Sequence, residues 1–332
     1  MIRIKRVFYS ALVAILVVAC GGGGNSGEEE GGGGGGGEVV VIGDGGGPIP
    51  PPEVIEVEPP IAFSGDFVLG ISGGINEEWA AVLNSNLQPR LNYVNGIVAL
   101  PQDMPVSLQD CGVANAFYVP RQPNLQTGEI IEPIIVMCWE LYFQMLANFD
   151  QTWPEDPDTA FLVSIGAYTH VLYHEIGHAL DDQLELPIVG NSESAADAIA
   201  TVFSVQSGEG INVISAALLF DTEEDGSFAA VHAGGADRAG DLFCWALGGD
   251  PALAEFFTEL TQVFVLSGRD CIGEYEAQLS AVSAWLPNIA GPVGLAADRT
   301  AAKLSGMSES MADGLRDAAN SSPTITRIKA DI

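Results

Sequence analysis

The sequence predicts an α+β fold in which a small N-terminal β-sheet precedes a mostly helical region. Short apolar runs separated by turn residues occupy residues 63–138, and such runs are typical of strands. From residue 139 onward, apolar residues recur at helical spacing in one segment after another. The hydrophobic share of 47% over 332 residues is sufficient for a substantial core. We therefore expect a folded domain at residues 61–290.

The first part of this domain combines strands with two helices. The segment around Trp79 has helical spacing, whereas two later apolar segments are separated by a connection that contains Pro, Asn and Gly. The expected elements are strands at residues 63–71, 106–120 and 130–138, and helices at residues 77–87 and 139–149.

The longest periodic segment, residues 159–184, predicts a central helix. It follows Asp158, a residue type that favours the N-cap, and it stops before Pro187. Its histidines and glutamate make a membrane-spanning role implausible. Further helices are expected at residues 192–207, 212–220, 236–247, 251–266 and 271–286, and a helical or partly disordered tail at residues 291–332.

The N-terminus has the pattern of an export signal. Three basic residues precede the apolar stretch 7–19, which is too short to span a membrane. The stretch ends in Val17-Val18-Ala19-Cys20, which resembles a bacterial lipobox, so we expect removal of residues 1–19 and a lipid anchor on Cys20. A plain signal peptide is the alternative. Because Gly21 follows Cys20, the resemblance favours the outer membrane of a two-membrane cell.

Residues 20–60 read as a flexible tether. The stretch is mostly glycine and then proline, with acidic residues, and it cannot bury enough surface to offset its chain entropy. The whole chain has 12 basic and 44 acidic residues, a formal charge of -32 that argues against nucleic acid as a partner. A strongly hydrated surface explains this charge more simply than recognition of a cationic ligand.

Four cysteines remain besides Cys20, an even number in an oxidising compartment. Three pairings are available, and we predict Cys111 with Cys138 and Cys244 with Cys271. Buried free thiols or a cysteine metal site are the alternatives, but no two of these residues have a C-x-x-C spacing.

The central helix carries His174-Glu175-Ile176-Gly177-His178, an H-E-x-x-H motif. Four residues advance a helix by about 400°, so both imidazoles point the same way and suit two zinc ligands. Glu175 could act as the general base on a water that zinc acidifies. The alternative is that these are ordinary polar residues of an amphipathic helix.

The next predicted helix carries Glu193 and Asp197, again on one face. Glu193 could be the third zinc ligand, and Asp197 could accept a hydrogen bond from a ligating histidine. Either could instead be an ordinary acid of this acidic chain. His170 lies one turn before His174, but a row of three such residues drifts by roughly 80°, so His170 is expected to support the metal ligands from behind or to be structural.

These motifs resemble the gluzincins, the thermolysin-like metallopeptidases, although the spacer before Glu193 is shorter than in thermolysin. The resemblance implies a zincin-like domain whose edge strand, here Asn115, Ala116, Phe117 and Tyr118, pairs with the substrate backbone. An ordinary buried strand is the alternative for this tetrapeptide.

The chain more closely resembles the metallopeptidase family called domain of unknown function 4344, over residues 67–286. The matching segments are residues 110–112, 115–118, 136–141, 174–180, 186–187, 193–197 and 242–245. The family pattern also has a histidine before an acid–arginine pair, matched by His232 and Asp237-Arg238. His232 could then stabilise the oxyanion of the reaction; a solvent-facing loop histidine is the alternative.

The resemblance implies a zinc metallopeptidase that hydrolyses peptide or protein substrates. Two other functions stay open. The protein could be a catalytically silent envelope lipoprotein that serves as a binding module, with structural zinc or none. It could also be a zinc amidase that cleaves peptidoglycan peptides.

Overall fold

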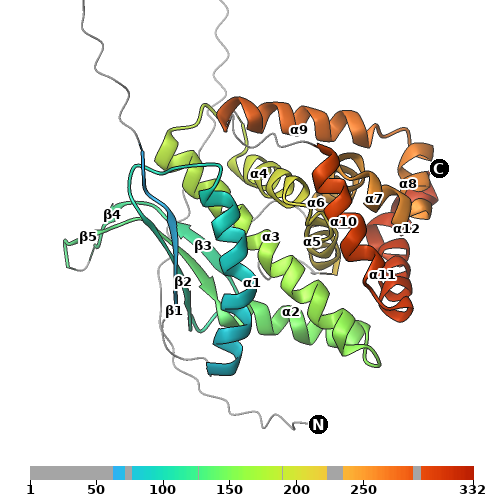
Figure 1. The fold of residues 1–332 in the computed structure, drawn as a ribbon, viewed down its shortest axis with the longest axis horizontal. Coiled ribbons are helices and arrows are strands. Elements are labelled where there is room, and N and C mark those ends of the chain that lie inside the picture. The colour runs from blue at the N-terminus through green and yellow to red at the C-terminus, as the bar shows by residue number, and fades with distance from the viewer. Residues whose placement is uncertain (1–62, 72–76, 126, 189, 223–234, 287–292) are drawn as a thin grey trace, which may run out of the picture. The chain divides into compact units, whose positions relative to one another are not determined.

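The computed structural model of the protein describes residues 63–71, 77–125, 127–188, 190–222, 235–286 and 293–332. These residues belong to one compact unit, Pro60–Ile332. The predicted signal sequence, Cys20 and the predicted tether lie outside the described residues. The expected α+β class is confirmed, because a small mixed sheet precedes a mostly helical region (Figure 1).

The main sheet has the strand order β1-β2-β6-β3. Strands β1 (Phe67–Ile71), β2 (Met104–Gln109) and β6 (Ile134–Cys138) are parallel, and β3 (Ala116–Val119) runs antiparallel to β6 at one edge. Alternate residues of β2 are buried, which shows that one face of the sheet packs on the core. A separate hairpin joins β4 (Gln122–Pro123) and β5 (Ile130–Ile131).

Helices lie against the buried face of the sheet (Figure 1). Helix α1 (Glu77–Asn95) contacts β1, and α2 (Trp139–Thr152) follows β6 directly. Helix α1 is longer than the predicted residues 77–87 and continues through Pro89, because Leu87, Leu91 and Val94 extend its buried stripe. Packing of this stripe outweighs the unfavourable proline.

Helix α3 (Pro157–Leu184) is the central element. It contacts β3 and β6, and also α2, α4 (Ser192–Gln206) and α5 (Ile211–Thr222). Its N-cap is Asp156 and not the predicted Asp158, because the Asp156 side chain accepts from the Thr159 N–H and Pro157 occupies the first turn. The helix ends at Glu185 in a left-handed conformation with φ 48°.

The remaining helices complete the domain around α3, α4 and α5. They are α6 (Gly235–Gly249), α7 (Pro251–Phe256), α8 (Thr258–Leu266), α9 (Cys271–Trp285), α10 (Val293–Ser305), α11 (Glu309–Ser321) and α12 (Pro323–Asp331). The C-terminal helices α10 to α12 bury Leu304, Leu315 and Ile325 in the common core. The described tail is thus three helices separated by short breaks, and Leu304, Leu315 and Ile325 pack it on the domain.

Three predicted elements are divided in the structure, and one of them, the strand expected at residues 130–138, forms β5 and β6 with residues 132–133 between them. Residues 106–120 form β2 and β3, separated by a turn in which Gly112 has φ 70°. A side chain is strained at that angle, so glycine favours the turn there. Residues 251–266 form α7 and α8, because the backbone leaves the helical region at Phe257, with φ -104° and ψ 48°.

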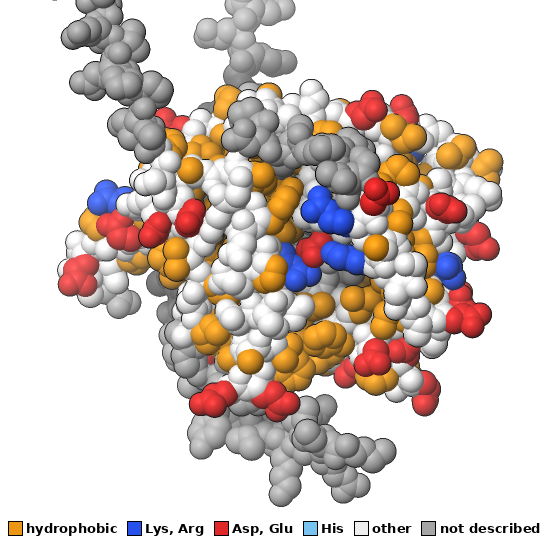
Figure 2. Space-filling model, in the orientation of Figure 1, with side chains coloured by type: hydrophobic (Ala, Val, Ile, Leu, Met, Phe, Trp, Pro, Cys, Tyr) orange, Lys and Arg blue, Asp and Glu red, His pale blue; other side chains and the backbone are white. Residues whose placement is uncertain are grey.

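Acidic side chains are scattered over the face shown in Figure 2 and do not gather in one patch. This distribution agrees with a hydrated acidic surface. Within the described ranges, none of the helices combines the length and the apolar character that a bilayer crossing needs.

Candidate metal centre

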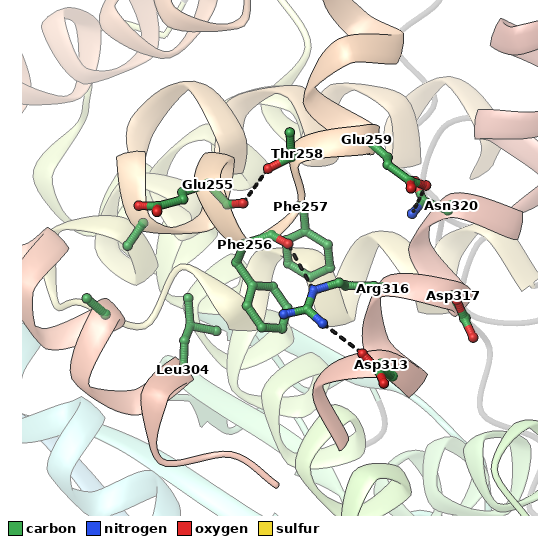
Figure 3. Close-up of a pocket in the computed structure, with 12 residues that line it drawn as sticks. Glu255, Phe256, Phe257, Thr258, Glu259, Leu304, Asp313, Arg316, Asp317 and Asn320 are labelled. Atoms are coloured by element: carbon green, nitrogen blue, oxygen red, sulfur yellow. Dashed lines mark hydrogen bonds and ion pairs between the residues drawn. The ribbon is translucent and has the colours of Figure 1, made fainter. Parts of the chain in front are cut away.

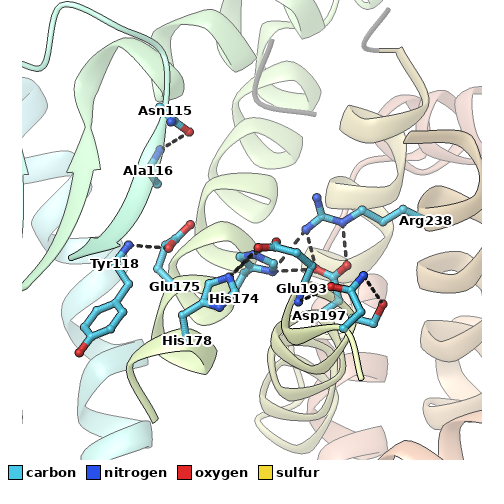
Figure 4. Close-up of polar contacts among 11 residues, drawn as sticks. Asn115, Ala116, Tyr118, His174, Glu175, His178, Glu193, Asp197 and Arg238 are labelled. Atoms are coloured by element: carbon cyan, nitrogen blue, oxygen red, sulfur yellow. Dashed lines mark hydrogen bonds and ion pairs between the residues drawn. The ribbon is translucent and has the colours of Figure 1, made fainter. Parts of the chain in front are cut away.

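His174 and His178 lie on the same side of α3, one turn apart. Their Nε2 atoms are 3.1 Å from each other. The His174 side chain is almost fully buried, with 1% of its surface exposed, whereas that of His178 is 17% exposed. The pair thus presents two nitrogen atoms to one point at the edge of the core (Figure 4).

Helix α4 brings a carboxylate to the same point. Oε2 of Glu193 lies 3.2 Å from Nε2 of His174, and its Oε1 lies 3.5 Å from Nε2 of His178. Gly177 permits this approach, because a Cβ at that position would lie 2.9 Å from the Cα of Ala196. The glycine inside the motif therefore lets α4 pack directly on α3.

Three potential ligand atoms, one from each of these residues, lie within 4.8 Å of one another. Two imidazoles and one carboxylate form a ligand set that suits zinc and leaves a fourth coordination position open. Burial alone would lower the pKa of His174, but Asp197 and Glu193 raise it to about 9. The carboxylates around His174 thus favour a positive charge at this point. A bound divalent cation would supply that charge in place of a proton.

Asp197 and Arg238 hold His174 in place from behind. Oδ1 of Asp197 lies 2.8 Å from Nδ1 of His174, so Nε2 is left facing Glu193. Arg238, on α6, donates to both Asp197 oxygens, at 2.7 Å from Nε and 2.6 Å from Nη2. Its guanidinium also stacks on the Phe220 ring, 3.9 Å from the centroid. Burial would raise the pKa of Asp197, but Arg238 and His174 hold it well below its ordinary value.

Glu175 faces the edge strand. Its Oε2 accepts a 2.8 Å hydrogen bond from the backbone N–H of Tyr118 in β3. Its Oε1 is buried and has no hydrogen-bond partner in the part of the chain that the structure describes. The carboxylate therefore lies between the histidine pair and the strand, with one oxygen still available (Figure 4).

Of the tetrapeptide predicted to bind substrate, three residues form most of β3. Ala116 and Phe117 pair with Met137 and Val136 of β6, and the other edge of β3 pairs with no described strand. Asn115 precedes the strand, and its side-chain Oδ1 accepts from the Ala116 N–H.

A model of the family described as "Putative metallopeptidase", domain of unknown function 4344, matches residues 80–286. The chain belongs to this family. The match begins within α1 and covers the strands after β1 and the helices from α2 through α9. No curated protein and no solved structure matches the chain. Family membership implies a metal ion and a peptide substrate, and the His174, His178 and Glu193 cluster is where this metallopeptidase-family chain could hold the ion.

His170 does not join this cluster. His170 is fully buried, and neither of its ring nitrogens has a hydrogen-bond partner among the described residues. Burial lowers its pKa to about 3, so the ring is neutral. His232 lies outside the described residues.

The predicted disulfides are confirmed. Cys111 pairs with Cys138, and Cys244 pairs with Cys271. Cys111, Cys138 and Glu140 also lie close together, but the two sulfurs are bonded to each other and cannot serve as thiolate ligands.

The sequence did not assign a role to Arg238 or Asp182. The family's acid–arginine pair singled out Arg238 in the sequence, but it did not predict the contact of Arg238 with Asp197. Asp182 lies two turns after Glu175 on α3 and accepts a 2.5 Å hydrogen bond from the Tyr118 hydroxyl. Its signal was the seven-residue spacing, which places both carboxylates on one helix face.

Proposed function

We propose that this protein is a zinc-dependent peptide hydrolase of the gluzincin type. The observation that carries the proposal is the convergence of His174, His178 and Glu193 beside a sheet edge, with Glu175 between the cluster and the strand. A metal-binding group alone would suit many functions. An extended peptide can add to the edge of a sheet, and here the edge of β3 that pairs with no described strand lies next to the cluster, where Glu175 accepts from its Tyr118 N–H.

His174, His178 and Glu193 would hold the zinc ion. When bound there, zinc supplies Lewis acidity, which polarises the substrate carbonyl and makes water easier to deprotonate. Asp197 contributes by fixing the His174 ring so that Nε2 faces the ion.

Glu175 would act as the general base and then the general acid. Its free Oε1 takes a proton from the attacking water, and the same carboxyl later delivers that proton to the leaving amine. The Tyr118 N–H holds the other oxygen, which fixes the orientation of the carboxylate.

Strand β3 would bind the substrate as an added strand, because its outer edge pairs with no described strand. His232 is proposed to stabilise the oxyanion, as the resemblance to the family pattern implies. The export signal and lipobox further support a lipid-anchored location in the bacterial cell envelope, with the outer membrane as the proposed site.

The deciding experiment measures metal content and peptidase activity on the same purified protein, with and without a chelator. The proposal predicts one zinc per chain and hydrolysis that the chelator abolishes and zinc restores. Absence of metal after reconstitution with zinc would support a silent binding module instead. Digestion of a muropeptide mixture beside a peptide library separates a peptidoglycan amidase from a general peptidase.

A further inference from the structure

A cavity of about 240 Å³ lies between the first turn of α4 and one side of α6. Asp237, Asp241 and Trp245 are spaced four residues apart on α6, so they form one stripe that faces α4. The lining residues are Asn191, Glu193, Ser194, Asp197, Asp237, Arg238, Asp241 and Trp245. None of the sequence motifs assigned a role to this stripe.

The cavity adjoins the candidate metal centre. Glu193 lines it and also contacts both histidines, at 3.2 and 3.5 Å. Asp197 and Arg238, which hold His174, form another part of its wall. A peptide with its scissile bond at the cluster could therefore place an adjacent side chain in this cavity.

The lining favours a ligand with positive charge. Four of the described lining residues are carboxylates; Glu193 belongs to the metal centre and Asp197 is paired with Arg238, so Asp237 and Asp241 supply the negative charge for a ligand. Arg238 directs Nε and Nη2 to Asp197, so its charge is already shared with that carboxylate. The repulsion from the carboxylates disfavours an acidic side chain here.

Arg327 and Arg269 lie beside the carboxylates of α6 and neutralise them only in part. Neither of these two arginines lines the cavity. Arg327 lies 3.0 Å from Asp237 in an exposed pair, and such pairs contribute little. Arg269 lies 3.0 Å from Asp241 but is shared with Glu274, which leaves that group of three charges with a net charge of -1. Burial raises the pKa of Asp241, against the opposing effect of Arg269.

A second observation also indicates a ligand. Arg238 has 8% of its side-chain surface exposed, and its Nη1 has no hydrogen-bond partner in the described chain. A buried guanidinium donor without an acceptor is costly, and a ligand with a carbonyl oxygen beside its cationic group would satisfy it. Trp245 adds an aromatic ring, and such rings attract cations.

We propose that this cavity is a specificity subsite that binds the lysine or arginine side chain of a substrate residue next to the scissile bond. The proposal rests on the proposed peptidase function. The carboxylates of Asp237 and Asp241 receive the charged end of the side chain, beside the ring of Trp245. The substrates are therefore basic peptides.

The test maps cleavage sites of the zinc-loaded protein in a peptide library. Lysine or arginine should be enriched at one position beside the cleaved bond. Asp241→Asn and Asp237→Asn should each reduce kcat/KM roughly five- to tenfold more for a lysine peptide than for its norleucine analogue. Asp317→Asn is the matched control, because Asp317 lines a different groove of about 620 Å³ between α7, α8, α10 and α11 (Figure 3).

Binding supplies a readout that does not depend on turnover. The Glu175→Gln protein, loaded with zinc, should bind the lysine peptide more tightly than the norleucine analogue, and Asp237→Asn should remove this difference. Asp237 is exposed, so its variant is expected to fold even if that of Asp241 does not. Cleavage or binding without a basic preference overturns the subsite. Selective binding without any hydrolysis overturns the peptidase function and leaves the subsite standing.

Discussion

The backbone N–H of Tyr118 lies 2.8 Å from Oε2 of Glu175, so the edge strand is bonded directly to the motif on α3. The hydroxyl of the same tyrosine donates to Asp182, two turns further along α3, and accepts from Gln183. One residue thus fixes β3 to the helix at two points. The distance between the strand and the histidines is set by this attachment.

Tyr118→Phe should weaken substrate binding and leave the metal in place. The variant keeps the backbone hydrogen bond to Glu175 and loses the hydroxyl's bonds with Asp182 and Gln183, each worth about 1 kcal/mol. We expect KM to rise several-fold with a small change in kcat. Steady-state kinetics with zinc analysis tests this, and Asp182→Ala should give the same result. A fall in kcat at constant KM would contradict a positioning role.

Glu175→Gln should retain zinc and lose hydrolysis. The amide is the same size and can still accept the Tyr118 N–H, but it cannot take a proton from water. General base catalysis contributes about 10²- to 10⁴-fold, so kcat should fall by at least that lower factor. Metal analysis and a peptidase assay on one preparation test this. A variant as active as the parent would show that another group is the base.

Arg238→Gln should lower the affinity for zinc. The guanidinium binds both oxygens of Asp197, which in turn orients His174, and loss of such support typically costs about 10- to 100-fold in metal affinity. Competition with a chromogenic chelator measures the change. Arg327→Gln is the matched control, since that arginine pairs with exposed Asp237. Equal zinc affinities of the two variants would show that Arg238 does not support the metal site.

The two disulfides offer a matched comparison, because each joins cysteines 27 residues apart. The chain-entropy contribution is then similar, about 3 kcal/mol for each. Replacing Cys244 and Cys271 by alanine should reduce stability without changing kcat/KM, because this bridge joins α6 to α9. Replacing Cys111 and Cys138 should lower both, because that bridge holds the turn that leads into β3. Thermal unfolding and kinetics distinguish the pairs; equal effects on activity would contradict this assignment.

Glu140 should make stability fall as the pH rises above its unfolded-state pKa. Burial and a hydrogen bond with Asp110 raise the pKa of Glu140 in the folded protein. Between the unfolded and folded pKa values the folded state binds more protons, so the free energy of unfolding decreases with pH. Above about pH 4, the melting temperature of the parent should therefore fall relative to that of Glu140→Gln until the pH passes the raised pKa of the folded state. Glu276→Gln is the control, because it removes one negative charge from the exposed surface of α9 and so shows the effect of charge loss alone. A constant difference would contradict the raised pKa.

The sequence by itself determined the features that depend on near neighbours along the chain. The spacing of His174 and His178 places both rings on one side of a helix whatever surrounds it, because helical geometry is local. Apolar periodicity located the helices well. It failed at the turn through Gly112 and at the break at Phe257, and it could not tell Asp156 from Asp158 as the N-cap.

Only the tertiary structure decided which distant residues meet. Glu193 reaches the histidines because Gly177 lets α4 pack closely on α3, and Arg238 reaches Asp197 because α6 packs beside α4. No periodicity encodes these contacts, since each depends on how separate helices pack. The surroundings of His170, which lies on the same helix as the motif, also depend on how the helices pack. Burial in the core leaves its ring neutral and without a described partner, while His174, one turn on, receives Asp197.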